Sequence, residues 1–337
     1  MMKIEYPFII AEMSGNHNQS LERALKIVDA AADAGASAIK IQTYTANTLT
    51  IKGVFEIKEK SSLWYGKDLY DLYDEAHTPW EWHKPIFDHA FKRGILCFSS
   101  PFDETAVDLL VSLDNPIYKI ASFEINHIPL LKYIARTGKP VIMSTGASSL
   151  IEIAEAVNVL KTEGCNNLTL LKCTSTYPAS AENSNLNTIP HLKDLFNCEI
   201  GLSDHTIGIG VAIAAIAKGA NVIEKHFCLD RSEGGVDSAF SLEPNEFKQL
   251  VIEAKNAYLA LGKINYGITN DEKKVDAGKR SIYVSENIYK GDLISKNNIK
   301  IIRPGFGLHP RYYEDVLGKK VNKDLNIGTP LSLNDLN

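Results

Sequence analysis

Two histidines follow apolar runs at neighbouring places in the chain. His205 lies in the stretch GLSDHTIGIG (residues 201–210) and His226 in NVIEKHFCLD (221–230). A single buried histidine is usually a hydrogen-bonded core residue. Two at matching ends of successive strands favour a shared site instead, and imidazole with carboxylate and water suits Mn²⁺, Fe²⁺, Co²⁺ or Zn²⁺. Because two histidines do not complete a structural zinc site, open positions would remain for water and substrate.

Polar residues also end most of the other apolar runs. The full set at these ends comprises Glu12, Asn16, His17, Lys40, Gln42, Ser99, Ser100, Lys119, Ser122, Ser144, Thr145, Thr174, Ser175, Tyr177, Ser203, Asp204, His205, Glu224 and His226. Burying so many polar groups is unfavourable unless they bind something. We therefore expect a ligand site where these runs end.

The set includes two cations and several hydroxyl groups. The hydroxyls belong to Ser100, Ser122, Ser144 and Ser203, and the cations to Lys40 and Lys119. Ammonium and hydroxyl donors together suit a small anion that bears phosphate and carboxylate. The alternative is that each lysine only pairs with a carboxylate at a strand end. Glu12 is such a carboxylate, since it lies inside an apolar strand.

The elements that must position these residues alternate along the chain. Eight short apolar runs are candidate strands, at residues 7–13, 38–43, 95–100, 117–122, 140–145, 168–173, 199–204 and 221–227. Amphipathic segments lie between them, at 21–34, 80–92, 104–113, 151–161 and 211–218. Strands that are apolar throughout are typical of a parallel sheet buried on both faces.

Eight such units predict a closed (β/α)₈ TIM barrel, in which the working groups lie at the carboxyl ends of the strands. An open doubly wound sheet is the competing fold. The first strand is not followed by the pattern G-x-G-x-x-G, which disfavours it.

Two features depart from the repeating pattern. Residues 44–79 are long for a strand-to-helix connection, so we expect a lid or an added hairpin. After the barrel, at 1–262, a polar linker at 263–279 precedes a small β-rich module at 280–337. A module of this size is marginal alone and is expected to lean on a partner surface.

The composition limits the class of protein. The net charge of −5 argues against a general nucleic-acid or membrane binder. The five cysteines are scattered, which is typical of reduced thiols in a cytoplasm, and Cys173 is expected to be a buried structural thiol. We expect no secretory leader and no membrane span. His83 and His89 are expected on a solvated helix surface.

A series of motifs along the chain resembles one known family. FIIAEMSGNHN, AIKIQTY, FSSPFD, YKIASFE, MSTG, LKCTSTYP, GLSDHT, EKHF and IRPGFGLHP are similar to motifs of the sialic acid synthase family. The resemblance covers the barrel, the linker and a C-terminal antifreeze-like (SAF) domain. It implies condensation of phosphoenolpyruvate with an N-acylated amino sugar aldehyde.

Within that family, EAHTPWEWH, CTSTYPA and DRSEGGVDSAFSLEP resemble the pseudaminic acid synthases more than the N-acetylneuraminate synthases. The latter usually carry Asn at the position of Ser175, and usually AEIGxNH where this chain has AEMSGNH. The acceptor sugar implied is 2,4-diacetamido-2,4,6-trideoxy-L-altrose, and the process is flagellin glycosylation. N-acetylneuraminate or legionaminic acid synthesis, a metal-dependent barrel aldolase, and a sugar-binding protein with an inert barrel remain the alternatives.

The resemblance also implies roles for individual residues. His205 and His226 would hold a divalent metal, usually Mn²⁺, with Co²⁺ or Mg²⁺ as alternatives, and Glu12 would contact its bound water and the reactive end of the sugar. Phosphoenolpyruvate would be bound by Lys40, Ser100, Lys119, Ser122, Ser144 and Ser203. The sugar would be lined by Gln42, Tyr177 and Asp237, and by Arg303 of the other subunit in a cytoplasmic, domain-swapped homodimer.

Overall fold

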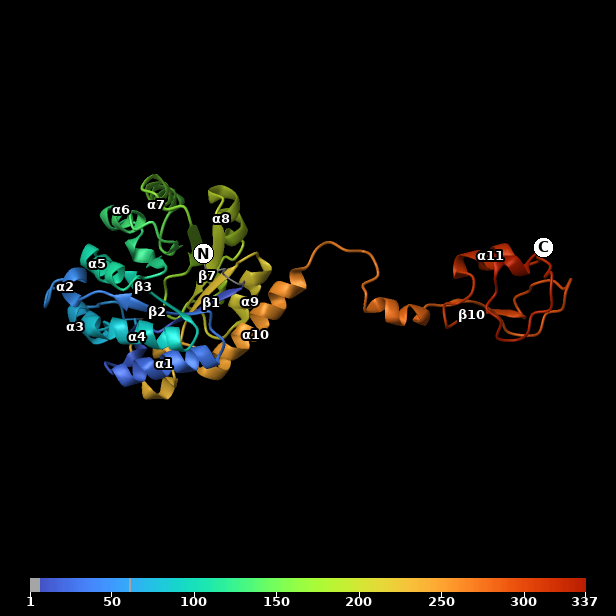
Figure 1. Ribbon diagram of the computed structural model, residues 1–337, viewed down its shortest axis with the longest axis horizontal. Coiled ribbons are helices and arrows are strands. Elements are labelled where there is room, and N and C mark those ends of the chain that lie inside the picture. The colour runs from blue at the N-terminus through green and yellow to red at the C-terminus, as the bar shows by residue number, and fades with distance from the viewer. Residues whose placement is uncertain (1–6, 61) are drawn as a thin grey trace. The chain divides into compact units, whose positions relative to one another are not determined.

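The computed structural model describes residues 7–60 and 62–337. The chain divides into two compact units, Met1–Gly262 and Lys263–Asn337 (Figure 1).

The first unit is a closed barrel of eight parallel strands. Each strand pairs with the next, and β1 pairs with β8 to close the barrel. The strands are β1 Phe8–Glu12, β2 Ala38–Thr43, β3 Leu96–Pro101, β4 Tyr118–Ile120, β5 Val141–Ser144, β6 Leu168–Cys173, β7 Glu199–Asp204 and β8 Val222–His226. The predicted (β/α)₈ fold is confirmed.

Helices surround the barrel (Figure 1). They are α1 Leu21–Asp33, α4 Trp80–Lys92, α5 Glu104–Ser112, α6 Ile128–Ala135, α7 Leu150–Thr162, α8 Thr188–Phe196, α9 Gly210–Ala217 and α10 Pro244–Leu261. Capping residues define where these helices begin and end, as α1 illustrates. Ser20 accepts a hydrogen bond from Arg23 N at 3.2 Å and caps α1. Gly35 follows α1 at φ 86°, a conformation that favours glycine.

The alternation of side chains along each strand divides apolar from polar residues. A buried apolar cluster comprises Phe8, Ile10, Ala38, Phe98, Ile117, Ile142, Leu171 and Val222. Glu12, Lys40, Lys119 and Glu224 each lie two positions after a member of this cluster. They therefore point to the same side of the sheet, the barrel interior, one layer closer to the carboxyl ends of the strands.

A buried ion pair fixes the register of the last two strands. Asp204 and Lys225 are partners in the β7–β8 ladder, and their side chains join at 2.7 Å with 2% and 0% exposure. Lys225 also donates to Thr206 O at 2.5 Å. Breaking such a pair usually costs about 3–5 kcal/mol, because it leaves one charge buried and unpaired. The pair immediately precedes His205 and His226, so it fixes where both imidazoles begin.

The long connection after β2 is a structured segment. It contains α2 Ala46–Leu49, an antiparallel bridge between Glu56 and Asp68, and α3 Leu69–Ala76. The bridge is extended by Ile57 N, which donates to Lys67 O at 3.0 Å. The prediction of an added hairpin is therefore confirmed.

The second unit has a core of its own. Strands β9 Ser281–Val284 and β10 Ile299–Ile302 are antiparallel, and α11 Tyr313–Val316 packs beside them. A short 3₁₀ helix, Glu272–Gly278, lies within the predicted linker. In the part of the chain that the structure describes, no helix is long and apolar enough to cross a membrane.

Candidate active site

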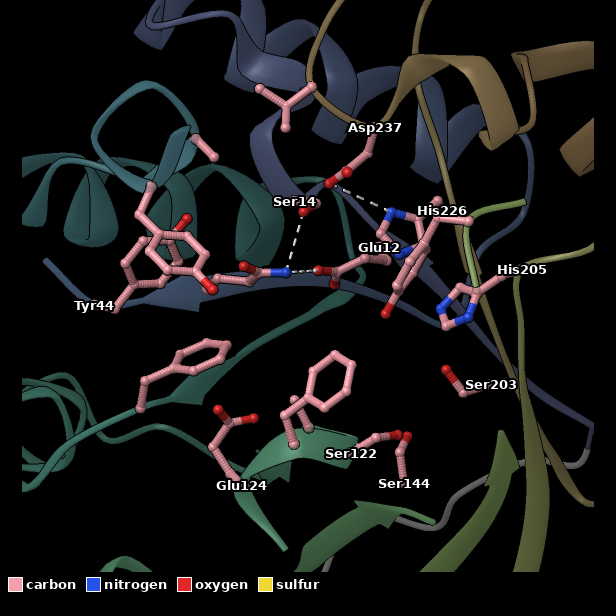
Figure 2. Close-up of a pocket in the computed structure, with 18 of the residues that line it drawn as sticks. Glu12, Ser14, Tyr44, Ser122, Glu124, Ser144, Ser203, His205, His226 and Asp237 are labelled. Carbon is pink, nitrogen blue, oxygen red and sulfur yellow. Dashed lines mark hydrogen bonds and ion pairs between the residues drawn. The ribbon is translucent and has the colours of Figure 1, made fainter. Parts of the chain in front are cut away.

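A cavity of about 330 Å³ opens at the carboxyl ends of the barrel strands (Figure 2). Eleven of the thirteen predicted site residues line it: Glu12, Lys40, Gln42, Lys119, Ser122, Ser144, Tyr177, Ser203, His205, His226 and Asp237. Ser100 lies behind the wall, where Lys40 Nζ donates to its hydroxyl at 3.4 Å. Arg303 is exposed in the second unit.

Four buried charges form the floor of the cavity. Lys40 Nζ lies 3.1 Å from Glu12 Oε2 and 3.3 Å from Glu224 Oε1. Lys119 Nζ lies 3.7 Å from the same Glu224 oxygen. The lysines thus pair with strand-end carboxylates and also face the cavity, so the two interpretations of these lysines are not exclusive.

The protonation of the two carboxyl groups differs. Burial raises the pKa of Glu12 to about 7, against the opposing effect of Lys40. Burial opposes ionisation of Glu224 as well, but Lys119 and Lys40 outweigh it and lower its pKa. Glu224 is therefore the permanent counter-charge of the lysines, whereas Glu12 can gain or lose a proton near neutral pH.

The serines differ in the hydrogens that they can offer. Ser122 Oγ accepts from Gly146 N at 3.1 Å, and Ser144 Oγ accepts from Lys119 Nζ at 2.7 Å. The hydroxyl hydrogen of Ser144 is thus left for a ligand oxygen, whereas Ser122 also has a hydrogen bond to the thiol of Cys173. Ser203 instead donates to Glu224 at 3.1 Å. Two serines beside one lysine form the best site for an anion.

The two imidazoles at the ends of β7 and β8 fit a metal ion. Their ring centroids are 5.3 Å apart. His205 Nδ1 lies 2.9 Å from Thr174 O, a pure acceptor, so Nδ1 carries a proton and Nε2 is the ring nitrogen left to bind a metal. His226 Nδ1 is buried and lacks a hydrogen-bond partner among the described residues, with Asp237 Oδ2 at 3.9 Å. Burial lowers the pKa of His226 and keeps it neutral, as a ligand must be.

Protein ligands beyond these two are missing from the arrangement. Within residues 7–60 and 62–337, no group of three or more histidine, cysteine, aspartate or glutamate side chains is placed to hold a metal. A metal here would keep most of its coordination positions for water and substrate, which is the open type of site that catalysis uses.

Gln42 joins Glu12 and Ser14 in a hydrogen-bonded group between the imidazoles and the aromatic side of the cavity. Gln42 Nε2 donates to Glu12 Oε1 at 2.9 Å and to Ser14 Oγ at 3.1 Å. The Tyr177 ring stacks on His205 at 4.4 Å between centroids. In Figure 2, Glu12 lies between the two histidines and Tyr44, which is at the opposite side of the cavity.

Sequence reasoning missed several residues of the site. Glu224 was recognised at a strand end but given no role. Ser14, Tyr44 and Glu124 line the cavity without having been singled out. For Glu124 the available signal was its place in the motif YKIASFE, directly after two predicted anion-binding residues. The aromatic residues of the 44–79 segment had no periodic signal.

Two histidines of α4 and the thiol of Cys173 differ in part from the surroundings predicted for them. The prediction of a solvated His83 is wrong: its side chain is buried, because α4 packs against β3, and it lies 2.7 Å from Thr43 Oγ1 at the end of β2. His89 is partly exposed and pairs with Asp29 at 2.8 Å. Cys173 is buried as expected, but it lines the cavity, 3.9 Å from His205 Nδ1.

The fold and the cavity define a TIM barrel with ammonium and hydroxyl donors and a pair of imidazoles at the carboxyl ends of its strands. Residues 27–266 match the NeuB family and residues 279–337 match the SAF domain. The chain belongs to the NeuB family.

Individual relatives agree with this assignment. The chain is 47% identical to the pseudaminic acid synthase of Campylobacter jejuni, over 97% of this chain and 96% of the relative. It is 42% identical to that of Helicobacter pylori, over 99% and 98%. A solved N-acetylneuraminic acid synthetase of Leptospira borgpetersenii in complex with citrate aligns with a TM-score of 0.72 and 35% identity, over 80% of this chain and 89% of that one.

The buried Glu124 leads to a prediction about stability and pH. Burial raises its pKa to about 7, so the folded chain binds this proton more tightly than the unfolded chain. The stabilisation is present below about pH 4.5 and is lost as pH rises through 7, at up to about 1.4 kcal/mol per pH unit. Glu124→Gln removes this dependence, so the variant gains stability over the wild type between pH 5 and pH 8. Urea unfolding across that range measures the difference.

Glu155, exposed on α7, is the matched control, and Glu155→Gln should run parallel to the wild type at every pH. Parallel curves for Glu124→Gln as well would contradict a raised pKa at Glu124.

Proposed function

We propose that this chain is a pseudaminic acid synthase. It condenses phosphoenolpyruvate with 2,4-diacetamido-2,4,6-trideoxy-L-altrose, giving pseudaminic acid and phosphate by C–O cleavage. The observation that carries the proposal is the placing of Lys119, Ser122 and Ser144 beside the His205–His226 pair in one cavity. An anion-binding site and a site for the electrophile within one cavity are what this condensation needs. The identity to pseudaminic acid synthases supports the choice of sugar.

Phosphoenolpyruvate binds at the lysine and serine side of the cavity. Lys119, the free hydroxyl hydrogen of Ser144 and the hydroxyl group of Ser122 hold its anionic groups. Lys40 and Ser203 add to this side through Glu224, which both contact. Ser100 acts only by positioning Lys40. The contribution of these residues is orientation and electrostatics, since they fix the enol methylene opposite the aldehyde.

A divalent metal, proposed as Mn²⁺, is held by His205 and His226. When bound it polarises the aldehyde oxygen of the open-chain sugar as a Lewis acid. Thr174 O fixes the tautomer of His205, and the ring of Tyr177 fixes its plane. Asp237 and Gln42 line the sugar beside this pair.

Glu12 is the proton-transfer group of the proposed reaction. The methylene carbon of phosphoenolpyruvate bonds to the aldehyde carbon, whose oxygen takes a proton. Water adds to the former enol carbon and loses a proton, and phosphate then leaves with its bridging oxygen. Glu12, with a pKa of about 7, can donate or accept at these steps. Gln42 donates to Oε1, whereas Oε2 faces the ammonium group of Lys40 at 3.1 Å.

The remaining proposals concern compartment and assembly. All five cysteines are free thiols, which supports a reducing cytoplasm. We also propose a homodimer in which Arg303 of one chain completes the sugar site of the other. Arg303 is exposed, and its guanidinium is a rigid donor fork that suits amide carbonyl and hydroxyl oxygens.

The reaction is tested by isotope tracing with the purified full chain. With Mn²⁺, phosphoenolpyruvate labelled with ¹⁸O at the bridging position, and the trideoxy sugar, we expect phosphate that retains the label. In ¹⁸O-water, the label should enter the 2-oxo group of the product. Sugars are compared by kcat/KM. Unlabelled phosphate would exclude C–O cleavage, product without phosphate release would favour an aldolase, and a preference for N-acetylmannosamine would overturn the acceptor.

The metal site is tested by direct binding. His205→Ala or His226→Ala should weaken Mn²⁺ binding at least 100-fold by calorimetry and abolish turnover, because the other imidazole alone cannot hold the ion. The circular dichroism spectrum should be unchanged. His89→Ala, on the barrel surface, is the control and should bind as the wild type does. Wild-type affinity in either cavity variant would rule out the assigned ligand.

Assembly in trans is tested by mixing subunits. Arg303→Ala and His205→Ala are each expected to be inactive. After dissociation and reassociation, a mixed dimer has one site with both defects and one with neither, so activity should return to about a quarter of the wild-type value. If Arg303 serves its own barrel, every site keeps one defect and the mixture stays inactive.

A further inference from the structure

One wall of the cavity is built from the hairpin segment and differs in chemistry from the rest. Eight residues of the segment 44–79 line the cavity: Tyr44, Leu49, Ile57, Trp64, Leu69, Leu72, Tyr73 and Ala76. None of them is charged, and five are aliphatic. We call them the apolar wall. The strand ends, by contrast, contribute lysines, carboxylates, serines and imidazoles to the cavity.

The wall is held in place before any substrate binds. Trp64 Nε1 donates to Val236 O at 3.1 Å, which ties the hairpin to the loop after β8. Leu69 N donates to Phe55 O at 2.8 Å, which joins α3 to the bridge. The Tyr44 ring packs edge-on against Phe102, with 5.1 Å between centroids. The indole hydrogen is thus occupied, so the polar side-chain atoms that the wall can still offer to a sugar are the hydroxyl groups of Tyr44 and Tyr73.

Several side chains of the wall remain partly exposed to the cavity. Leu49, Ile57 and Leu69 are only half-buried although they face a concave surface. Partly exposed aliphatic groups in a cavity gain free energy when an apolar group covers them, about 25 cal/mol per Å². A hydroxyl group in the same place would lose its water without a partner.

The position of the wall decides which part of the sugar it meets. The reacting aldehyde carbon must lie near Glu12 and the histidine pair, where the proton and the metal act. Tyr44, the first residue of the wall, lies across the cavity from His205 and His226 (Figure 2). Tyr73 packs against Tyr44 with 6.0 Å between ring centroids, and Leu69 lies one helical turn before Tyr73 in α3, whereas Trp64 lies 6.0 Å from Tyr177. The end of the sugar remote from the aldehyde is therefore the end that reaches the part of the wall that contains Tyr44 and Leu69.

We propose that the apolar wall, through Ile57 and Leu69, binds the C6 methyl group of the acceptor and selects a 6-deoxy sugar over its 6-hydroxy counterpart. This rests on the proposed function, which supplies the acceptor. The residues of the wall are specificity-determining: they contact the remote end of the sugar and take no part in bond making.

The test compares two sugars that differ only at C6, the trideoxy L-altrose and its 6-hydroxy counterpart. Leu69→Gln and Ile57→Thr place polar atoms in the wall, and both side chains are exposed enough to change without loss of the fold. Each variant should lower kcat/KM for the 6-deoxy sugar about 10-fold, which is the effect of losing one methyl contact. The ratio of kcat/KM for the 6-hydroxy sugar to that for the 6-deoxy sugar should rise. The KM for phosphoenolpyruvate and the affinity for Mn²⁺ should not change.

Leu63→Gln is the matched control. Leu63 is in the same segment and 50% exposed, but is not one of the lining residues, so its variant should keep the wild-type ratio of the two sugars. An unchanged ratio in both wall variants, or an equal loss for both sugars, would overturn the role of the wall while leaving the synthase function intact. A wild-type enzyme that uses N-acetylmannosamine and neither altrose overturns the proposed acceptor, and the wall assignment with it.

Discussion

The burial of four charges in one barrel is the constraint on which the site depends. Glu12 and Lys40 are partners in the β1–β2 ladder, and Glu12 and His226 are partners in the β1–β8 ladder. A slip of one residue would turn each of these side chains to the opposite face of the sheet and leave its counter-charge alone in the interior. The pairing of β7 with β8 also leaves no room for a side chain at Gly201, where a Cβ atom would come within 2.2 Å of Val222 O. Register, closure and site are thus set together.

The balance among the four buried charges also explains how an anion can bind beside a group of side chains that is nearly neutral overall. Lys40 already has two carboxylate partners, so it offers little net attraction to a ligand. Lys119 has one carboxylate partner among the described residues, the shared oxygen of Glu224 at the longer distance of 3.7 Å, and its other bonds go to the neutral acceptors Ser144 Oγ and Ile120 O. A bound anion near Glu12 would further favour its protonated form, which leaves Lys40 with one counter-charge in place of two. Binding of the anion and proton uptake by Glu12 therefore support each other.

The strand-level features of the site could be predicted from sequence because parity and order along a parallel barrel fix them. Eight apolar runs give the strands, and the residue that ends each run must reach the cavity or lie behind it. Ser100 shows the limit of this reasoning. It has the right parity, but it is buried, contacts Lys40 and is not among the residues that line the cavity, which only packing can reveal. His83 shows the same limit on the outer face, where a helix that appeared amphipathic in sequence buries its histidine against Thr43. Glu224 could have been assigned a role from charge alone, since two interior lysines require a counter-charge.

The division of labour in the cavity follows from the same geometry. Successive side chains along a strand alternate between the interior and the exterior of the barrel. Each strand end therefore supplies only one or two well-fixed groups to the cavity, which suits proton transfer, anion binding and metal ligation. It cannot supply a broad apolar surface without taking residues from the core. A connection that is long enough to form its own hairpin and helix can supply such an apolar surface. Its backbone N–H and C=O groups are then hydrogen-bonded within the segment, and its side chains are free to face the cavity. The segment between β2 and α4 does this, and its tie through Trp64 to the loop after β8 makes that surface fixed. In the proposed enzyme, residues on the strands and their ends carry out the reaction, and a hairpin that can change without disturbing the register selects the sugar.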